Sequence, residues 1–157
     1  MTALLYMSRA LVLNTKINRK LRRLEGLREA ATRTTATVQE DVVSRTRNVH
    51  PMADIIDRMV DMEREIDEDI DRLVSVKEEL SKTISQVDDP VYQSVLELRY
   101  VCFKEWDEIA QALNYNKRTP YKIHAKALEA VQEILDSEKC YENWAVEGTC
   151  GQQGIVL

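Results

Sequence analysis

A repeat of apolar residues between residues 52 and 87 constrains the fold more than any other feature. Steps of four and three residues, taken alternately from Met52, reach eleven positions: Met52, Ile56, Met59, Glu63, Ile66, Ile70, Leu73, Lys77, Leu80, Ile84 and Val87. All of them except Glu63 and Lys77 are apolar, which makes nine apolar positions. This spacing is typical of a coiled-coil helix. Such a helix would be about 54 Å long at about 1.5 Å per residue, and its apolar seam needs another helix to cover it.

The first segment of the chain offers one partner for this seam. Residues 3–30 hold no proline, and they predict a helix with one apolar stripe: Tyr6, Ala10, Leu13, Ile17, Leu21, Leu24 and Leu27. Residues 1–40 carry a net charge of +5 and residues 41–90 a net charge of −7, so the two helices attract each other. We expect an antiparallel hairpin, with a homodimer through the 52–87 helix as the alternative.

Residues 31–51 predict the loop of this hairpin. They contain five threonines without an apolar period and end at His50-Pro51, where helical geometry is disfavoured before the proline. Asp88-Asp89-Pro90 then predicts a new helix, because aspartate is a good N-cap and proline suits the first helical position. Its predicted stripe is Val91, Val95, Leu98, Val101 and Cys102.

Shorter helices are expected at about 106–113 and 117–136, followed by a flexible tail at 137–157. The predicted fold is therefore all-α. A long antiparallel, coiled-coil-like hairpin spans 1–88 with its loop at about 31–51, and a helix-turn-helix domain spans 89–136. The four glycines form no phosphate-binding loop, and no apolar stretch is long enough to span a membrane.

The three cysteines, Cys102, Cys140 and Cys150, have unrelated spacings, which predicts reduced thiols in a cytoplasmic protein, with Cys102 as a small core residue. The N-terminus does not read as a signal peptide. No catalytic set, metal-ligand spacing or cofactor motif stands out, so we expect neither an enzyme nor a bound metal or cofactor.

The stretch from Trp106 to Val131 has the pattern of a helix-turn-helix. Ile109 and Ala110 would face inward, and Asn114 would adopt the left-handed conformation that ends the first helix. Tyr115 would plug the turn and Asn116 would cap the second helix. Residues 114–128 carry a local charge of +4 within a chain of net charge −5. A local patch of this kind can bind DNA because salt confines the reach of each charge to about 10 Å.

These residues also resemble a known family. Glu97-Leu98-Arg99-Tyr100, Trp106-Asp107-Glu108-Ile109-Ala110 and His124-Ala125-Lys126-Ala127-Leu128 are similar to region 4 of sigma-70-type factors. The layout of residues 5–135 resembles small phage and prophage proteins of Gram-positive bacteria, of the autolysin-regulator and late-transcription-regulator groups.

The resemblance implies a sequence-specific regulator of phage or prophage genes that binds double-stranded DNA and contacts RNA polymerase. The residues assigned to the DNA interface are Lys117, Arg118, Thr119, Tyr121, Lys122 and Lys126. Two departures matter: Tyr121 replaces a typical arginine, and Pro120 stands within the reading helix. Either Asn116 caps a helix that lacks one N–H at Pro120, or Thr119-Pro120 begins the helix and leaves Lys117 and Arg118 in the turn.

Two other functions remain open. The long acidic helix could make the chain a protein-binding module for a host or phage partner. A DNA-packaging role like that of a small terminase subunit is the third hypothesis. In none of these do we expect contact with a membrane.

Overall fold

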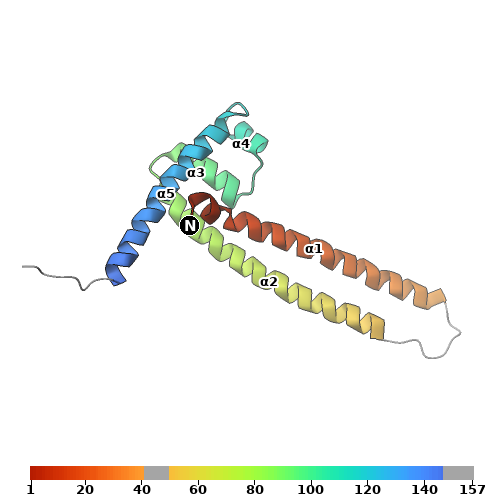
Figure 1. Ribbon diagram of the computed structural model, residues 1–157. Coiled ribbons are helices and arrows are strands. Elements are labelled where there is room, and N and C mark those ends of the chain that lie inside the picture. The colour runs from red at the N-terminus through yellow and green to blue at the C-terminus, as the bar shows by residue number, and fades with distance from the viewer. Residues whose placement is uncertain (41–49, 147–157) are drawn as a thin grey trace, which may run out of the picture. The chain divides into compact units, whose positions relative to one another are not determined.

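The computed structural model describes the backbone of residues 1–40 and 50–146 and the side chains of residues 1–33 and 52–138. Within these residues the chain is all-α, as predicted (Figure 1). In chain order the elements are α1 (Ala3–Glu40), α2 (His50–Ser85), α3 (Pro90–Leu96), the π-helical turn η1 (Glu97–Val101), α4 (Trp106–Ala112) and α5 (Thr119–Val146).

These elements form two compact units. The arm unit comprises Arg9–Glu78, and so holds most of α1 and α2. The head unit combines Met1–Ser8 with the chain from Glu79 onward, so it holds the start of α1, the end of α2, and α3 to α5. The boundary expected from the sequence, between residues 88 and 89, divides the chain at a different point.

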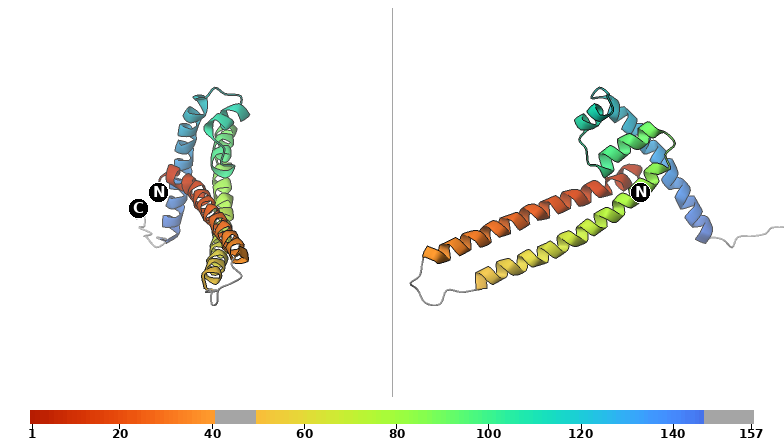
Figure 2. Two further views of the ribbon diagram at one scale, coloured as in Figure 1. Left: turned by 90° about the vertical axis from the view of Figure 1, so that its right-hand side faces the viewer. Right: turned by 180° about the vertical axis from the view of Figure 1, so that it is seen from behind.

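In the arm unit, α1 and α2 lie side by side and run antiparallel (Figure 2). Ion pairs join them: Lys16 Nζ lies 2.8 Å from Asp69 Oδ1, Lys20 Nζ lies 2.9 Å from Glu65 Oε2, and Arg28 Nη2 lies 3.1 Å from Glu63 Oε1. From Lys16 to Lys20 to Arg28 the α1 residue of the pair moves toward the C-terminus, while its α2 partner moves toward the N-terminus, from Asp69 to Glu65 to Glu63. The two helices are therefore antiparallel. Ile17, Leu24 and Ile66 form the apolar core, with Met59, Met62 and Leu73 packed against it.

A buried carboxylate interrupts this core. The side chain of Asp69 is only 3% exposed, and its two oxygens lie 2.8 Å from Lys16 Nζ and 2.7 Å from Lys20 Nζ. The hydrogen bond from Lys16, and then the contact with Lys20, hold the pKa of Asp69 below its usual range. The same contact raises the pKa of Lys20. Asp69 therefore stays ionised between the two helices, with its charge compensated from α1.

The burial pattern corrects one of the two predicted seam positions within the arm unit, whereas Ile84, at this position in the head unit, is buried as predicted. Met59, Ile66, Leu73, Leu80 and Val87 are buried or half-buried, as expected. The prediction placed Glu63 and Ile70 in the seam as well. The residues that are buried or half-buried there are instead Met62 and Asp69, each one residue earlier, and Ile70 is 41% exposed. Ile56 and, on α1, Leu21 are exposed as well, against the prediction. The prediction followed apolar side chains, whereas ion pairing buries Asp69.

The two long helices also have different ends from those predicted. α1 continues ten residues beyond residue 30 to Glu40, so residues 31–40 of the expected loop are helical. No glycine or proline stands between residues 27 and 40, and the Thr32 hydroxyl donates to the Arg28 carbonyl within the helix at 2.9 Å. Residues 41–49 of that loop lie outside the described residues. α2 begins at His50, because Pro51 is tolerated in a first helical turn.

In the head unit, α3 starts as predicted. Asp89 caps it, since its Oδ1 accepts a hydrogen bond from the Val91 N–H at 2.8 Å, and Pro90 occupies the first helical position. The expected stripe is partly wrong. Val95, Leu96 and Tyr100 are buried, while Val91 and Cys102 are exposed. Cys102 follows η1, whose wider turn shifts the buried face away from the regular helical period, whereas Val91 precedes η1 and is exposed in the first turn of α3.

The N-terminal residues belong to the core of the head unit. Met7 is fully buried, and the Ala3 N–H donates to Gln132 Oε1 on α5 at 2.7 Å. The hydroxyls of Tyr6 and Thr83 lie 2.9 Å apart. The start of α1 is therefore tied to both the end of α2 and α5.

α5 is longer than expected. It runs to Val146, so the first ten residues of the predicted flexible tail at 137–157 are helical. The glycines that suggested a flexible tail begin only at Gly148, and residues 137–146 contain neither glycine nor proline. The remainder of that tail, residues 147–157, is outside the described residues. Among the described helices, none has a stretch long and apolar enough to cross a membrane.

Candidate nucleic-acid interface

The candidate interface consists of α4, the turn after it and the start of α5. α4 begins with a capping box: the Glu105 N–H donates to the Glu108 carboxylate at 2.8 Å, and Glu105 accepts in return from the Glu108 backbone. The hydrogen bond from the Glu105 backbone lowers the pKa of Glu108. Ile109 and Ala110 are buried, as predicted. The first helix of the pair is thus fixed by its N-terminus and by its inner face.

The turn after α4 has the geometry of a Schellman motif. Asn114 adopts the left-handed conformation with φ of 56°, as predicted. The Tyr115 N–H donates to the Ala110 carbonyl at 2.8 Å, and the Asn114 N–H donates to the Gln111 carbonyl at 3.2 Å. The backbone of Tyr115 closes the turn, but its side chain is 38% exposed, so the expectation that this ring plugs the turn is wrong.

The start of α5 decides between the two predictions for Pro120. The helix begins at Thr119, so Lys117 and Arg118 lie in the turn. Asn116 Oδ1 accepts hydrogen bonds from the Thr119 hydroxyl at 2.7 Å and from the Thr119 N–H at 3.3 Å, so Asn116 closes the turn that leads into the helix and does not stand directly before its first residue. Pro120 follows in the first turn, where no hydrogen bond needs its missing N–H, and it is fully buried.

Lys117, Arg118, Thr119 and Lys122, which we call the basic turn, come together around one open depression. The depression has a volume of about 370 Å³, and Asn116 completes its lining. It lies at the N-terminus of the 28-residue helix α5. The helix dipole adds positive potential at such a terminus. Four of the six predicted interface residues therefore lie in one cluster.

The cations of this surface differ in their pairing. Lys117 Nζ lies 3.4 Å from Asp107 Oδ1 on α4, with both side chains largely exposed. Among the residues whose side chains are described, Arg118, Lys122 and Lys126 have no acidic partner within ion-pair distance. Lys126 is exposed one turn after Lys122, outside the lining of the depression. Three of the predicted cations thus keep their charge available for an anion.

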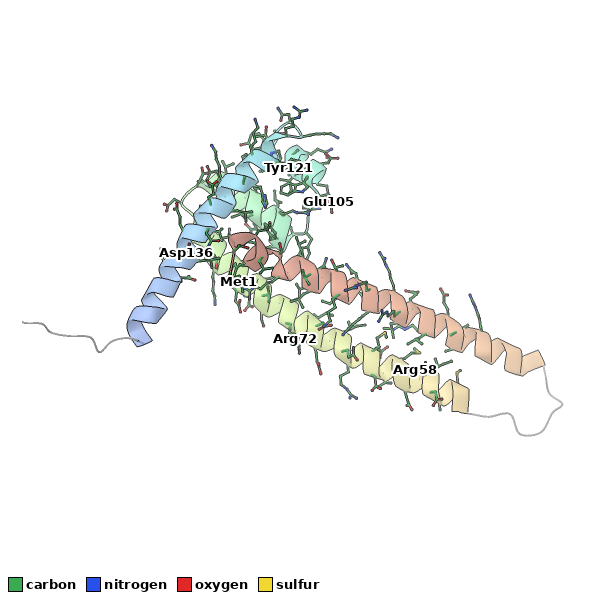
Figure 3. All side chains as sticks on the ribbon, viewed as in Figure 1. Met1, Arg58, Arg72, Glu105, Tyr121 and Asp136 are labelled. Carbon is green, nitrogen blue, oxygen red and sulfur yellow. The ribbon has the colours of Figure 1, made fainter. Side chains whose placement is uncertain are left out.

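Tyr121, the remaining predicted residue, lies near the start of α5 (Figure 3), and its ring belongs to an aromatic cluster with those of Trp106 and His124. Its ring centroid lies 4.6 Å from that of Trp106, and the Tyr121 side chain remains 51% exposed. The Arg99 guanidinium lies 4.9 Å from the Trp106 ring centroid, within cation–π range. Trp106 is therefore a packing residue at the start of α4, and its ring supports that of Tyr121 at the surface.

Two residues that the interface prediction omitted, Arg99 and Tyr100, hold this cluster together. Tyr100 Oη lies 2.7 Å from His124 Nε2, and the rings of His124 and Trp106 meet edge to face with centroids 4.9 Å apart. Burial, followed by the nearby Arg99 charge, lowers the pKa of His124, and burial raises the pKa of Tyr100. Both are therefore neutral near pH 7. The sequence shows that Arg99 and Tyr100 are adjacent. It does not show that, from η1, Arg99 reaches Trp106 on α4 and Tyr100 reaches His124 on α5.

The described residues bring no three His, Cys, Asp or Glu side chains together in a way that could hold a metal ion. Comparison with curated proteins and with solved structures gave no match. Residues 33–132 match the sequence profile of a family described as a protein of unknown function, DUF1492. This match covers more than half of the chain, from the later part of α1 into α5. The chain therefore belongs to the DUF1492 family.

Proposed function

We propose that α4, the turn and α5 form a helix-turn-helix that binds double-stranded DNA, and that the protein is a sequence-specific transcriptional regulator. The observation that carries this proposal is the basic turn. It gathers three cations and a hydroxyl around an open depression at a helix N-terminus. Cationic side chains and helix N-termini are the groups that hold DNA phosphates.

The residue at which α5 starts indicates which side chains would contact phosphates and which would contact bases. Because the helix starts at Thr119, Lys117 and Arg118 project from the turn, where phosphate contacts fix the register of a protein on DNA. Tyr121 and Lys122 are exposed in the first helical turn, and Lys126 follows one turn later. In a helix-turn-helix these N-terminal positions of the second helix contact base edges in the major groove.

The charge along α5 limits the surface available to DNA. Lys122, Lys126, Glu129 and Glu133 are exposed at steps of four, three and four residues, so they share one side of the helix. The first two are cationic and the last two are acidic. A polyanion is therefore attracted only to the first two turns of α5, which is the part of such a helix that enters a major groove.

The test is selection of binding sites from random duplex DNA by the purified full-length protein. We expect a defined sequence to be enriched, and we expect a triple variant with Lys117, Arg118 and Lys122 changed to alanine to lose binding to it. A matched control changes three exposed cations elsewhere, Arg22, Arg58 and Lys82, to alanine, and it alters the net charge equally.

Circular dichroism would verify that both triple variants keep their helices. Retained binding in the basic-turn variant, or equal loss in the control variant, would overturn the assignment of the interface. Failure to enrich any sequence would leave non-sequence-specific packaging or protein binding as the better hypothesis. The resemblance to sigma region 4 also makes RNA polymerase a proposed partner, which co-purification with the polymerase tests separately.

A further inference from the structure

One face of the arm unit exposes apolar side chains from both helices. On α2, Ile56, Val60, Ile70 and Val74 are between 41% and 51% exposed. Ile56, Glu63 and Ile70 follow one another at seven-residue steps, so they share a side of the helix. Glu63 pairs with Arg28 of α1 at 3.1 Å. The apolar side chains therefore flank a point where α2 contacts α1.

α1 contributes to the same face. Leu21 is 44% exposed and stands seven residues before Arg28, which places both on one side of α1. We call Leu21, Ile56, Val60, Ile70 and Val74 the arm face. Although the Arg28–Glu63 ion pair lies among them, these residues make the surface largely apolar, and an exposed apolar patch of this kind marks an interaction site.

The arm unit needs additional burial. In its described side chains, the buried apolar residues are only Ala10, Ile17, Leu24 and Ile66. A pair of long helices with so small a core is marginal as an isolated structure. Packing against two more helices would cover the arm face and complete a four-helix arrangement.

Charge complementarity indicates what covers this face. Residues 9–33 of α1 hold eight basic and two acidic residues, whereas residues 52–78 of α2 hold four basic and ten acidic residues. A partner that suits the whole face must therefore present an acidic helix to α1 and a basic helix to α2. A second arm unit does both, provided that α1 of each copy faces α2 of the other.

We propose that the arm face is a homodimer interface, in which two arm units pack face to face about a twofold axis parallel to their helices. This axis sets each α1 over the α2 of the other copy, and it leaves the two α1 helices parallel. A twofold axis perpendicular to the helices and lying in the interface would instead set α1 on α1 and α2 on α2, with like charges opposed. The proposal does not depend on DNA binding by the head unit.

The test measures the mass of the full-length protein by analytical ultracentrifugation over a concentration series. We expect a dimer, and we expect the double variant Ile70→Glu and Val74→Glu to shift its dissociation constant at least about tenfold upward, since 1.4 kcal/mol of apolar burial corresponds to about that factor. The matched control is Val12→Glu, because Val12 is 64% exposed on α1 but is not part of the arm face. The control should dimerise like the unaltered protein.

A second pair of variants tests the interface without adding acidic charge. Ile70→Ala and Val74→Ala keep the helix and weaken only apolar burial, so they should weaken the dimer less than the glutamates do. An unaltered protein that is monomeric at every concentration would overturn the proposal. A dimer that survives both double variants would also overturn it, because its interface must then lie elsewhere.

Discussion

The Tyr100 hydroxyl lies 2.7 Å from Nε2 of His124, and this contact joins η1 to α5 across the centre of the aromatic cluster. Tyr100 is buried and His124 is half-buried. Because Arg99 lies beside them, a proton added to His124 would place a second positive charge next to the guanidinium. The cluster is therefore built for a neutral imidazole.

Acidification should destabilise the head unit through His124. Its pKa is lowered in the folded protein, so the unfolded chain binds a proton first as the pH falls below about 6.5. Above about pH 6.5, His124 should make the free energy of unfolding neither rise nor fall with pH. Between about pH 6.5 and the lowered pKa of His124 in the folded protein, the free energy of unfolding should decrease as the pH decreases. Chemical denaturation at a series of pH values measures this, and His124→Gln should reduce the dependence in that window.

Asp107→Asn should strengthen DNA binding if the basic turn is the interface. Asp107 lies 3.4 Å from Lys117, so it competes with a phosphate for this cation and also repels DNA. Titration at several salt concentrations should show a tighter complex. Weaker binding by Asp107→Asn would show that the carboxylate positions Lys117 instead.

Arg118→Ala should change how DNA binding responds to salt. Each phosphate that a protein cation neutralises releases condensed counterions from the DNA, so the affinity falls as the salt concentration rises. Removing one such cation should make the negative slope of log affinity against log salt shallower by about 0.9. The same titration series measures this slope for the unaltered protein and for the variant. An unchanged slope would show that Arg118 does not hold a phosphate.

Two substitutions of Asp69 should weaken the arm unit to different degrees. Asp69→Asn leaves the Lys16 and Lys20 ammonium groups without their carboxylate but keeps an oxygen that accepts a hydrogen bond, so it should reduce the free energy of unfolding by about 1–3 kcal/mol. Asp69→Leu removes this acceptor as well and sets an apolar side chain against the two ammonium groups, so it should cost more than Asp69→Asn. Thermal denaturation of both variants measures the difference. A stability that is unchanged in both variants would show that the ion pairs of Asp69 do not stabilise the helix pair.

Met7→Ala should destabilise the head unit although Met7 stands near the N-terminus. Its side chain is fully buried, and removing a buried methionine side chain typically costs about 2–5 kcal/mol. Leu5→Ala is the matched control, because Leu5 is 61% exposed and should change the stability by about 0.5 kcal/mol or less. Equal destabilisation of the two full-length variants in a denaturant titration would contradict the assignment of Met7 to the core.

Local signals in the sequence predicted local structure well. Asp89-Pro90 caps and starts α3, and Asn114 takes the left-handed conformation, since neither outcome depends on distant residues. The basic turn was likewise predictable, because Lys117, Arg118 and Lys122 are close in the chain and the turn that Asn116 closes leads directly into α5.

Long-range effects were not predictable from the same patterns. Asp69 is buried because Lys16 and Lys20 lie opposite it on another helix, and apolar periodicity favoured its neighbour Ile70 instead. Cys102 was expected in the core from a regular helical period, which η1 interrupts. The extension of α5 past residue 136 follows from the absence of a helix-breaking residue, whereas the prediction gave more weight to glycines further along.

The π-helical turn at Glu97–Val101 also bears on how members of this family should be aligned. A turn closed by i to i+5 hydrogen bonds holds one residue more than an α-helical turn. A relative that lacks one residue here could wind the same segment as a plain α-helix and still direct its counterparts of Arg99 and Tyr100 to the same neighbours. A one-residue gap at this place would then record a difference in winding, and residues on either side of it would remain equivalent.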